Sequence, residues 1–253
     1  MKNKGKNLLI FETSYCVVKC IHNKSNIADS QLLTATKPNM YLFFDTETTG
    51  LPISWSAPIS DSENWPRLVQ IAWVIHNDVG KEIKSRNYII KPENFFIPHE
   101  AAKVHKITTE IANEKGVALD AVLNEFANDI NNIKFLIAHN IDFDEKVIGA
   151  ELFRKNVKNK ISGVEKICTM KSSVDFCQIP GKEKYKYPKL QELYFKLFNK
   201  NFEDAHDAMV DVKACMKCFF EMEKLDIIKN TKQQISNKNP QKKIGLTQSI
   251  FNF

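Results

Sequence analysis

The chain has 253 residues, 43% hydrophobic and 26% charged, which is enough apolar material for a sizeable core. No apolar run approaches the ~20 residues of a membrane-spanning helix, and six cysteines in a chain of this length do not indicate a disulfide scaffold. We therefore expect a cytoplasmic protein with no membrane partner. The net charge is +6, and five lysines but no acidic residue follow Asp226, so the end of the chain permits a polyanionic partner.

Residues 1–39 show no clear periodicity, so we expect a poorly ordered N-terminal extension or an upstream over-assignment of the start codon. The pattern strengthens at Met40, where the segment MYLFFD predicts a buried strand. Apolar patterns farther along predict four more strands, at residues 67–77, 82–92, 134–140 and 166–170. Helical patterns cover residues 99–116, 118–132, 142–156, 189–199 and 206–225.

The order of these elements predicts an α/β fold, a mixed sheet with helices on both faces. We expect residues 40–228 to form the folded domain. Residues 229–253 are polar and basic, and we expect a flexible tail that ends in an apolar hexapeptide.

Two carboxylates follow the first predicted strand, in the stretch LFFDTETTGL. Asp45 and Glu47 are one residue apart, so in a strand both side chains project from the same face. Two like charges held close together repel, and burial raises the cost. The arrangement therefore requires something on that face that offsets the repulsion.

Two more acidic clusters occur, Asp142 and Asp144 after the fourth strand, and Asp207 and Asp211 near the start of the last helix. His206 can lie near Asp211 only if it sits at or just before that helix start. Carboxylates at the ends of adjacent strands converge at one edge of a sheet. Divalent hard cations favour carboxylate ligands. Two such cations together stabilise the attacking and leaving oxygens of a phosphoryl displacement. A nearby neutral histidine can accept a proton from the attacking water.

Three motifs now stand in order: FDTETTG, HNIDFD at residues 139–144, and the histidine and aspartate of residues 206 and 211. Together they resemble the DnaQ-like (DEDDh) 3′–5′ exonuclease family, which includes the epsilon proofreading subunits of bacterial DNA polymerase III. The resemblance covers roughly residues 40–222. It implies a ribonuclease H-like fold, with a central five-stranded mixed sheet flanked by helices.

The resemblance also implies roles for the site residues. It makes Asp144 a metal ligand rather than Asp142, and Asp211 rather than Asp207. His206 becomes the general base, and the product is a nucleoside 5′-monophosphate released from a DNA 3′ end. Two Mg²⁺ ions, for which Mn²⁺ can substitute, would be held by Asp45, Glu47, Asp144 and Asp211.

The segments beside these acids would meet single-stranded or frayed DNA 3′ ends. By resemblance, Thr48 and Gly50 approach the terminal sugar, and Leu51 packs against the last base. Asn140 and Phe143 would lie beside the terminal nucleotides. A glycine suits a close approach of backbone to ligand, because it has no Cβ.

The hexapeptide QSIFNF resembles a short peptide by which epsilon subunits dock on the sliding clamp, here with Gln248, Phe251 and Phe253. It could equally be an apolar cap on its own domain. A DNA polymerase is a further partner that the resemblance suggests. Two rivals to a proofreading or repair exonuclease remain open: an oligoribonuclease-like RNA exonuclease, and a non-catalytic tether for a polymerase or clamp.

Overall fold

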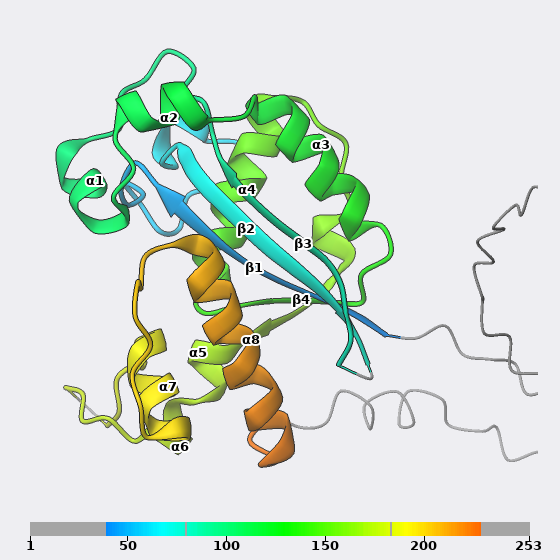
Figure 1. The fold of residues 1–253 in the computed structure, drawn as a ribbon, viewed down its shortest axis with the longest axis vertical. Helices are drawn as coiled ribbons and strands as arrows, with labels where there is room; N and C mark the ends of the chain where they lie inside the picture. Colours follow the sequence, from blue (N-terminus) through cyan, green and yellow to red (C-terminus); the bar gives the residue numbers. More distant parts are fainter. Residues whose placement is uncertain (1–38, 79, 183, 229–253) are drawn as a thin grey trace, which may run out of the picture. The chain divides into compact units, whose positions relative to one another are not determined.

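Five strands form one mixed sheet in a computed structural model that describes residues 39–78, 80–182 and 184–228 (Figure 1). The strand order across the sheet is β3-β2-β1-β4-β5. The first three strands pair antiparallel, and β1, β4 and β5 pair parallel. Their bounds are β1 Met40–Thr48, β2 Leu68–Asn77, β3 Glu82–Ile89, β4 Phe135–Ala138 and β5 Glu165–Cys168. The predicted five-stranded mixed sheet is confirmed.

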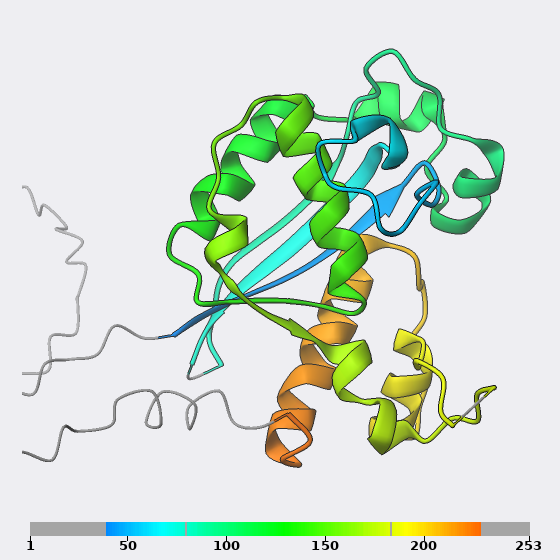
Figure 2. The ribbon, with the colours of Figure 1, turned by 180° about the vertical axis from the view of Figure 1, so that it is seen from behind.

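Helices cover both faces of the sheet, as the two opposite views show (Figures 1 and 2). On one face lie α3 (Leu119–Ile130) and α4 (Ile141–Arg154), and on the other lies α8 (Ala208–Lys224). The shorter helices are α1 His99–His105, α2 Thr109–Lys115, α5 Thr169–Ser172, α6 Val174–Cys177 and α7 Leu190–Phe198, with 3₁₀ turns η1 Ser62–Asn64 and η2 Ile161–Gly163.

The central strand β1 joins two cores, because successive side chains point to opposite faces. Leu42 and Phe44 pack in the core beneath α3 and α4, whereas Tyr41 and Phe43 pack in the core beneath α8. All four side chains are at most 1% exposed. This strand is therefore fixed on both sides up to the point where its carboxylates begin.

The region after β5 differs from the prediction. A strand was expected over residues 166–170, but β5 ends at Cys168 and α5 begins at Thr169. The turn is stabilised by polar side chains: the Cys168 sulfur accepts from the backbone N–H of Lys171, and the Ser173 hydroxyl donates to the Thr169 carbonyl at 2.7 Å. The two short helices α5 and α6 carry too few residues for a periodic signal.

The predicted extension and tail lie outside the described residues, apart from Asn39, and so do Gln248, Phe251 and Phe253. Across the part of the chain that is described, no helix combines the length and apolar character that crossing a bilayer requires.

Candidate active site

The carboxylates of β1 lie at its carboxyl end, on the α8 side of the sheet. Asp45 and Glu47 continue the alternation of Tyr41 and Phe43, so they face the same way. Glu47 pairs across the strands with Gln70, and the register shifts directly after it. These two acids therefore lie at the carboxyl end of the central strand, where its regular pairing with β2 ends.

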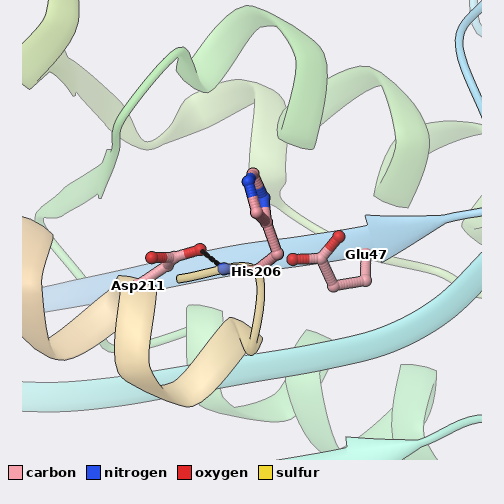
Figure 3. A group of neighbouring side chains, drawn as sticks. All are labelled: Glu47, His206 and Asp211. Carbon is pink, nitrogen blue, oxygen red and sulfur yellow. Dashed lines mark hydrogen bonds between the residues drawn. The ribbon is translucent and has the colours of Figure 1, made fainter. Parts of the chain in front are cut away.

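The start of α8 presents the histidine and the last aspartate. Asp207 is the N-cap, and its carboxylate accepts from the backbone N–H groups of Met209 and Val210 at 3.0 and 3.2 Å. His206 precedes it with φ at +72°, in the left-handed region that histidine adopts more readily than most residues. The backbone N–H of His206 donates to Asp211 Oδ2 at 2.9 Å (Figure 3).

These elements bring a strand residue and two helix-start residues together. The ligand atoms of Glu47, His206 and Asp211 all lie within 4.8 Å of one another. Figure 3 shows the carboxylates of Glu47 and Asp211 on either side of His206. Asp211 is only 8% exposed, whereas His206 is open to solvent. Such a group could hold a cation and leave the imidazole accessible to a substrate.

The fourth acid comes from α4. Asp144 is 3% exposed, and its Oδ1 accepts from the backbone N–H and the hydroxyl of Thr46, at 3.0 and 2.7 Å. Asp142, two residues earlier, is exposed and forms an ion pair with Lys171 on α5. The geometry therefore directs Asp144 toward β1 and Asp142 toward solvent.

Burial and mutual repulsion raise the pKa values of all four acids. Burial, then Asp211 and Asp144, raise the pKa of Glu47 to about 8. Burial, then the neighbouring acids, hold the pKa of Asp45 well above its usual range. Burial raises the pKa of Asp144 to about 7 despite its bonds from Thr46, and burial also raises that of Asp211. The close carboxylates repel one another, and their oxygen donors suit divalent cations.

A cavity of about 390 Å³ opens beside Glu47, between the end of β1, helix α1 and the start of α4. Thr48, Gly50, Leu51 and Phe143 line it, so four of the five predicted nucleotide contacts share one space. Asn140 does not line it. It is instead the N-cap of α4, with φ at +78°.

The backbone conformation at Gly50 favours glycine. Its φ is +150°, a conformation that residues with a Cβ rarely adopt, and the Thr48 hydroxyl donates to its carbonyl at 2.7 Å. A Cβ built at this position would meet no described atom within 4 Å. The requirement for glycine in the described structure is therefore conformational, and the space next to it is open.

A family model for exonucleases, RNase_T, matches residues 42–219, a span that contains every acid of this site. The chain belongs to this exonuclease family. No curated protein sequence matches the chain.

Among solved structures, this exonuclease resembles the zinc-bound form of the E. coli exonuclease I–single-stranded DNA complex, with a TM-score of 0.60 and 18% identity over 80% of this chain and 44% of that one. The E. coli enzyme with a dA16 oligonucleotide has a TM-score of 0.60 and 16% identity, over 79% of this chain and 44% of that one. Exonuclease I from Methylocaldum szegediense has a TM-score of 0.61 and 17% identity, over 79% of this chain and 43% of that one. The chain spans less than half the length of these structures, and the likeness confirms the fold.

One positioning residue of the exonuclease site was missed from the sequence. Gln70 is 3% exposed on β2, and its Oε1 accepts from the backbone N–H of Ala208 at 3.3 Å. Its Nε2 lies 3.3 Å from Asp207 Oδ2 as a donor. The side chain thus ties β2 to the first turn of α8. A lone glutamine inside the apolar run LVQIAWVI was the available signal.

Two other histidines, His139 and His105, form hydrogen bonds within the protein. His139 bonds to the Thr169 hydroxyl and the Pro188 carbonyl at 3.0 and 2.9 Å, and burial lowers its pKa to about 4. It therefore holds neighbouring segments together. His105 is 5% exposed, lines the cavity, and accepts from the backbone N–H of Ile107 at 3.1 Å.

Proposed function

We propose that this exonuclease is a divalent-metal-dependent 3′–5′ exodeoxyribonuclease of the proofreading or repair type. It would act on single-stranded or frayed DNA 3′ ends and release nucleoside 5′-monophosphates. The observation that carries the proposal is the convergence of four acids, two buried and two half-buried, and an exposed histidine beside a cavity of about 390 Å³. The solved exonuclease I complexes with single-stranded DNA support the choice of DNA.

The acids fit a cation site on the chemistry of their donors. We assign the ligand role to Asp45, Glu47, Asp144 and Asp211, with two Mg²⁺ as the resident ions and Mn²⁺ as a substitute. Bound divalent cations supply Lewis-acid stabilisation of the negative charge on phosphoryl oxygens. The raised pKa values support this assignment, because cations would offset the repulsion that raises them.

The remaining residues orient the substrate and move a proton. His206 is exposed and its backbone is tied to Asp211, which supports a role for its imidazole in accepting a proton from the attacking water. Thr48, Gly50, Leu51 and Phe143 would hold the terminal nucleotide in the cavity. Binding there would place the last phosphodiester beside Glu47, which lines the same cavity.

The direct test is digestion of matched DNA and RNA oligonucleotides carrying a label at either end, with Mg²⁺ or with EDTA. We expect nucleoside monophosphates from the DNA 3′ end, faster from mismatched than from paired ends, and none with EDTA. Digestion of the RNA oligonucleotides alone would show that RNA, and not DNA, is the substrate. Absence of turnover with either nucleic acid would favour a non-catalytic tether.

Clamp docking through Gln248, Phe251 and Phe253, and association with a DNA polymerase, stay predictions of the sequence. If replacing Phe251 and Phe253 with alanine abolished binding to the sliding clamp, the clamp-docking prediction would be supported.

A further inference from the structure

One tryptophan of the chain is exposed next to the cavity. The sequence has three tryptophans, and Trp65 and Trp73 are 2% and 0% exposed. Trp55, on the loop between β1 and β2, is 52% exposed. A large aromatic side chain gains free energy from burial, so an exposed ring beside a substrate cavity offers an apolar face to a ligand.

Polar contacts hold the loop backbone around Trp55. Asn64 is 6% exposed, accepts from the backbone N–H of Ser54 at 2.6 Å and donates to its carbonyl at 2.9 Å. The Lys146 ammonium donates to the Trp55 carbonyl at 2.7 Å. The position of Trp55 is therefore fixed from both sides of the peptide, and Lys146 adds a positive charge beside it.

The ring continues the wall of the nucleotide cavity. The centroid of Trp55 lies 5.8 Å from that of Phe143, which lines the cavity, and the planes are tilted by 49°. A cavity of about 390 Å³ is at the small end of ligand pockets, so we assign one terminal nucleotide to it. The next base of the strand would then lie outside the cavity, where Trp55 offers an exposed ring beside Phe143.

We propose that Trp55 is a stacking platform for the unpaired base that precedes the 3′-terminal nucleotide. The proposal rests on the proposed function, because it takes single-stranded DNA as the ligand. Every base has a π-face, so the contact tolerates any sequence, and Lys146 is near enough to favour the adjoining phosphate. An enzyme with this platform binds 3′ ends with at least two unpaired nucleotides more tightly than ends with one.

The experiment uses the full chain with Asp45→Asn to prevent turnover, Mg²⁺ present, and short oligodeoxyadenylates. Because Trp65 and Trp73 are buried, Trp55 dominates quenching of tryptophan emission by acrylamide. We expect the oligonucleotide to change Trp55 emission and to protect it from acrylamide, and deoxyadenosine 5′-monophosphate to do neither. Replacing Trp55 with phenylalanine in this background should remove the signal and keep affinity, measured by anisotropy, within about 2-fold.

Trp55→Ala should weaken oligonucleotide binding roughly 5- to 100-fold and leave mononucleotide binding unchanged. The matched control is Phe153→Ala on α4, an aromatic side chain of similar exposure, 53%, which should bind like the parent. Equal affinity of the Trp55→Ala variant and the parent, or bound oligonucleotide with unchanged Trp55 emission, would overturn the stacking role alone. If the parent chain neither binds nor digests DNA, both the stacking role and the proposed function fail.

Discussion

Two aspartates at the start of α4 differ in what they contact, although one residue separates them in the sequence. Asp144 is buried against Thr46, and Asp142 is exposed and paired with Lys171. We expect Asp144→Asn to lower turnover at least ~100-fold, because it removes a charge of the acidic cluster. The asparagine keeps an oxygen that can accept from Thr46, so the melting temperature should change little.

The matched control is Asp142→Asn, which should stay within about 2-fold of the wild-type turnover because its carboxylate faces solvent. The measurement is the rate of nucleotide release at saturating substrate, with the melting temperature beside it. Equal losses from both variants would contradict the assignment of Asp144 to the site.

The pKa of Glu47 provides a second prediction at this scale. Its folded pKa is about 8 and that of Asp144 is about 7, whereas in the unfolded chain both acids are ionised above ~pH 5. The folded metal-free protein therefore binds more protons, and its stability falls as pH rises toward 8. The pKa values of His76, His105 and His139 are lowered from 6.5, so most of their opposite contribution arises below that pH and the rest fades within about one pH unit above it.

We thus expect the melting temperature with EDTA to fall between pH 6.5 and pH 8, and Mg²⁺ to remove most of the fall. Glu47→Gln should flatten the EDTA curve, because the neutral amide does not ionise. Each kcal/mol lost corresponds to roughly 2–4 °C in a chain of this size. A curve with EDTA that rises over this range would contradict the cluster's electrostatics.

At the scale of elements, the start of α8 controls where His206 lies. Asp207 caps the helix, and His206 directly before it adopts the left-handed conformation. We expect Asp207→Ala to cost about 0.5–2 kcal/mol of stability and to lower turnover, because the cap that fixes the His206 backbone is lost. Asp207→Ser keeps a capping oxygen and should recover both properties. The measurements are denaturant unfolding and steady-state turnover.

A serine variant that regains stability but not turnover would give Asp207 a chemical role of its own. Gln70→Leu is a complementary change, because it removes the contact to Ala208 and leaves the cap in place. It should lower turnover more than it lowers the melting temperature.

The sequence predicted the parts of the site that depend on local geometry. Period two placed Asp45 and Glu47 on one face, and the five-residue spacing placed His206 just before a helix near Asp211. It did not predict Gln70, the cavity wall from α1 or the exposure of Trp55, because each depends on contacts between segments far apart in the chain. The strand expected at residues 166–170 ended early for a related reason, since side-chain caps at Cys168 and Ser173 override a short apolar pattern.

At the scale of the whole molecule, charge is divided between the folded domain and the segments beside it. Residues 40–228 contain 25 basic and 28 acidic side chains, and 11 of the 36 basic residues of the chain lie outside them. A net acidic domain repels a phosphate backbone unless cations fill its site. We therefore expect the flanking lysines to supply much of the salt-dependent affinity for single-stranded DNA.

Replacing the five lysines after Asp226 with glutamine tests this expectation. Each phosphate contact on a single strand contributes about 0.7 to the slope of log affinity against log salt, so the slope should shrink by at most ~3.5. Turnover of a short oligonucleotide at saturation should not change, because none of these lysines is among the residues assigned to the site. As a matched control, the double variant Lys158→Gln and Lys160→Gln, at exposed positions of the domain, should keep the full slope. An unchanged slope in the five-lysine variant would contradict this expectation. The phosphate contacts would then come from the domain itself or from the six lysines before Met40. Replacing those six lysines would distinguish the two sources.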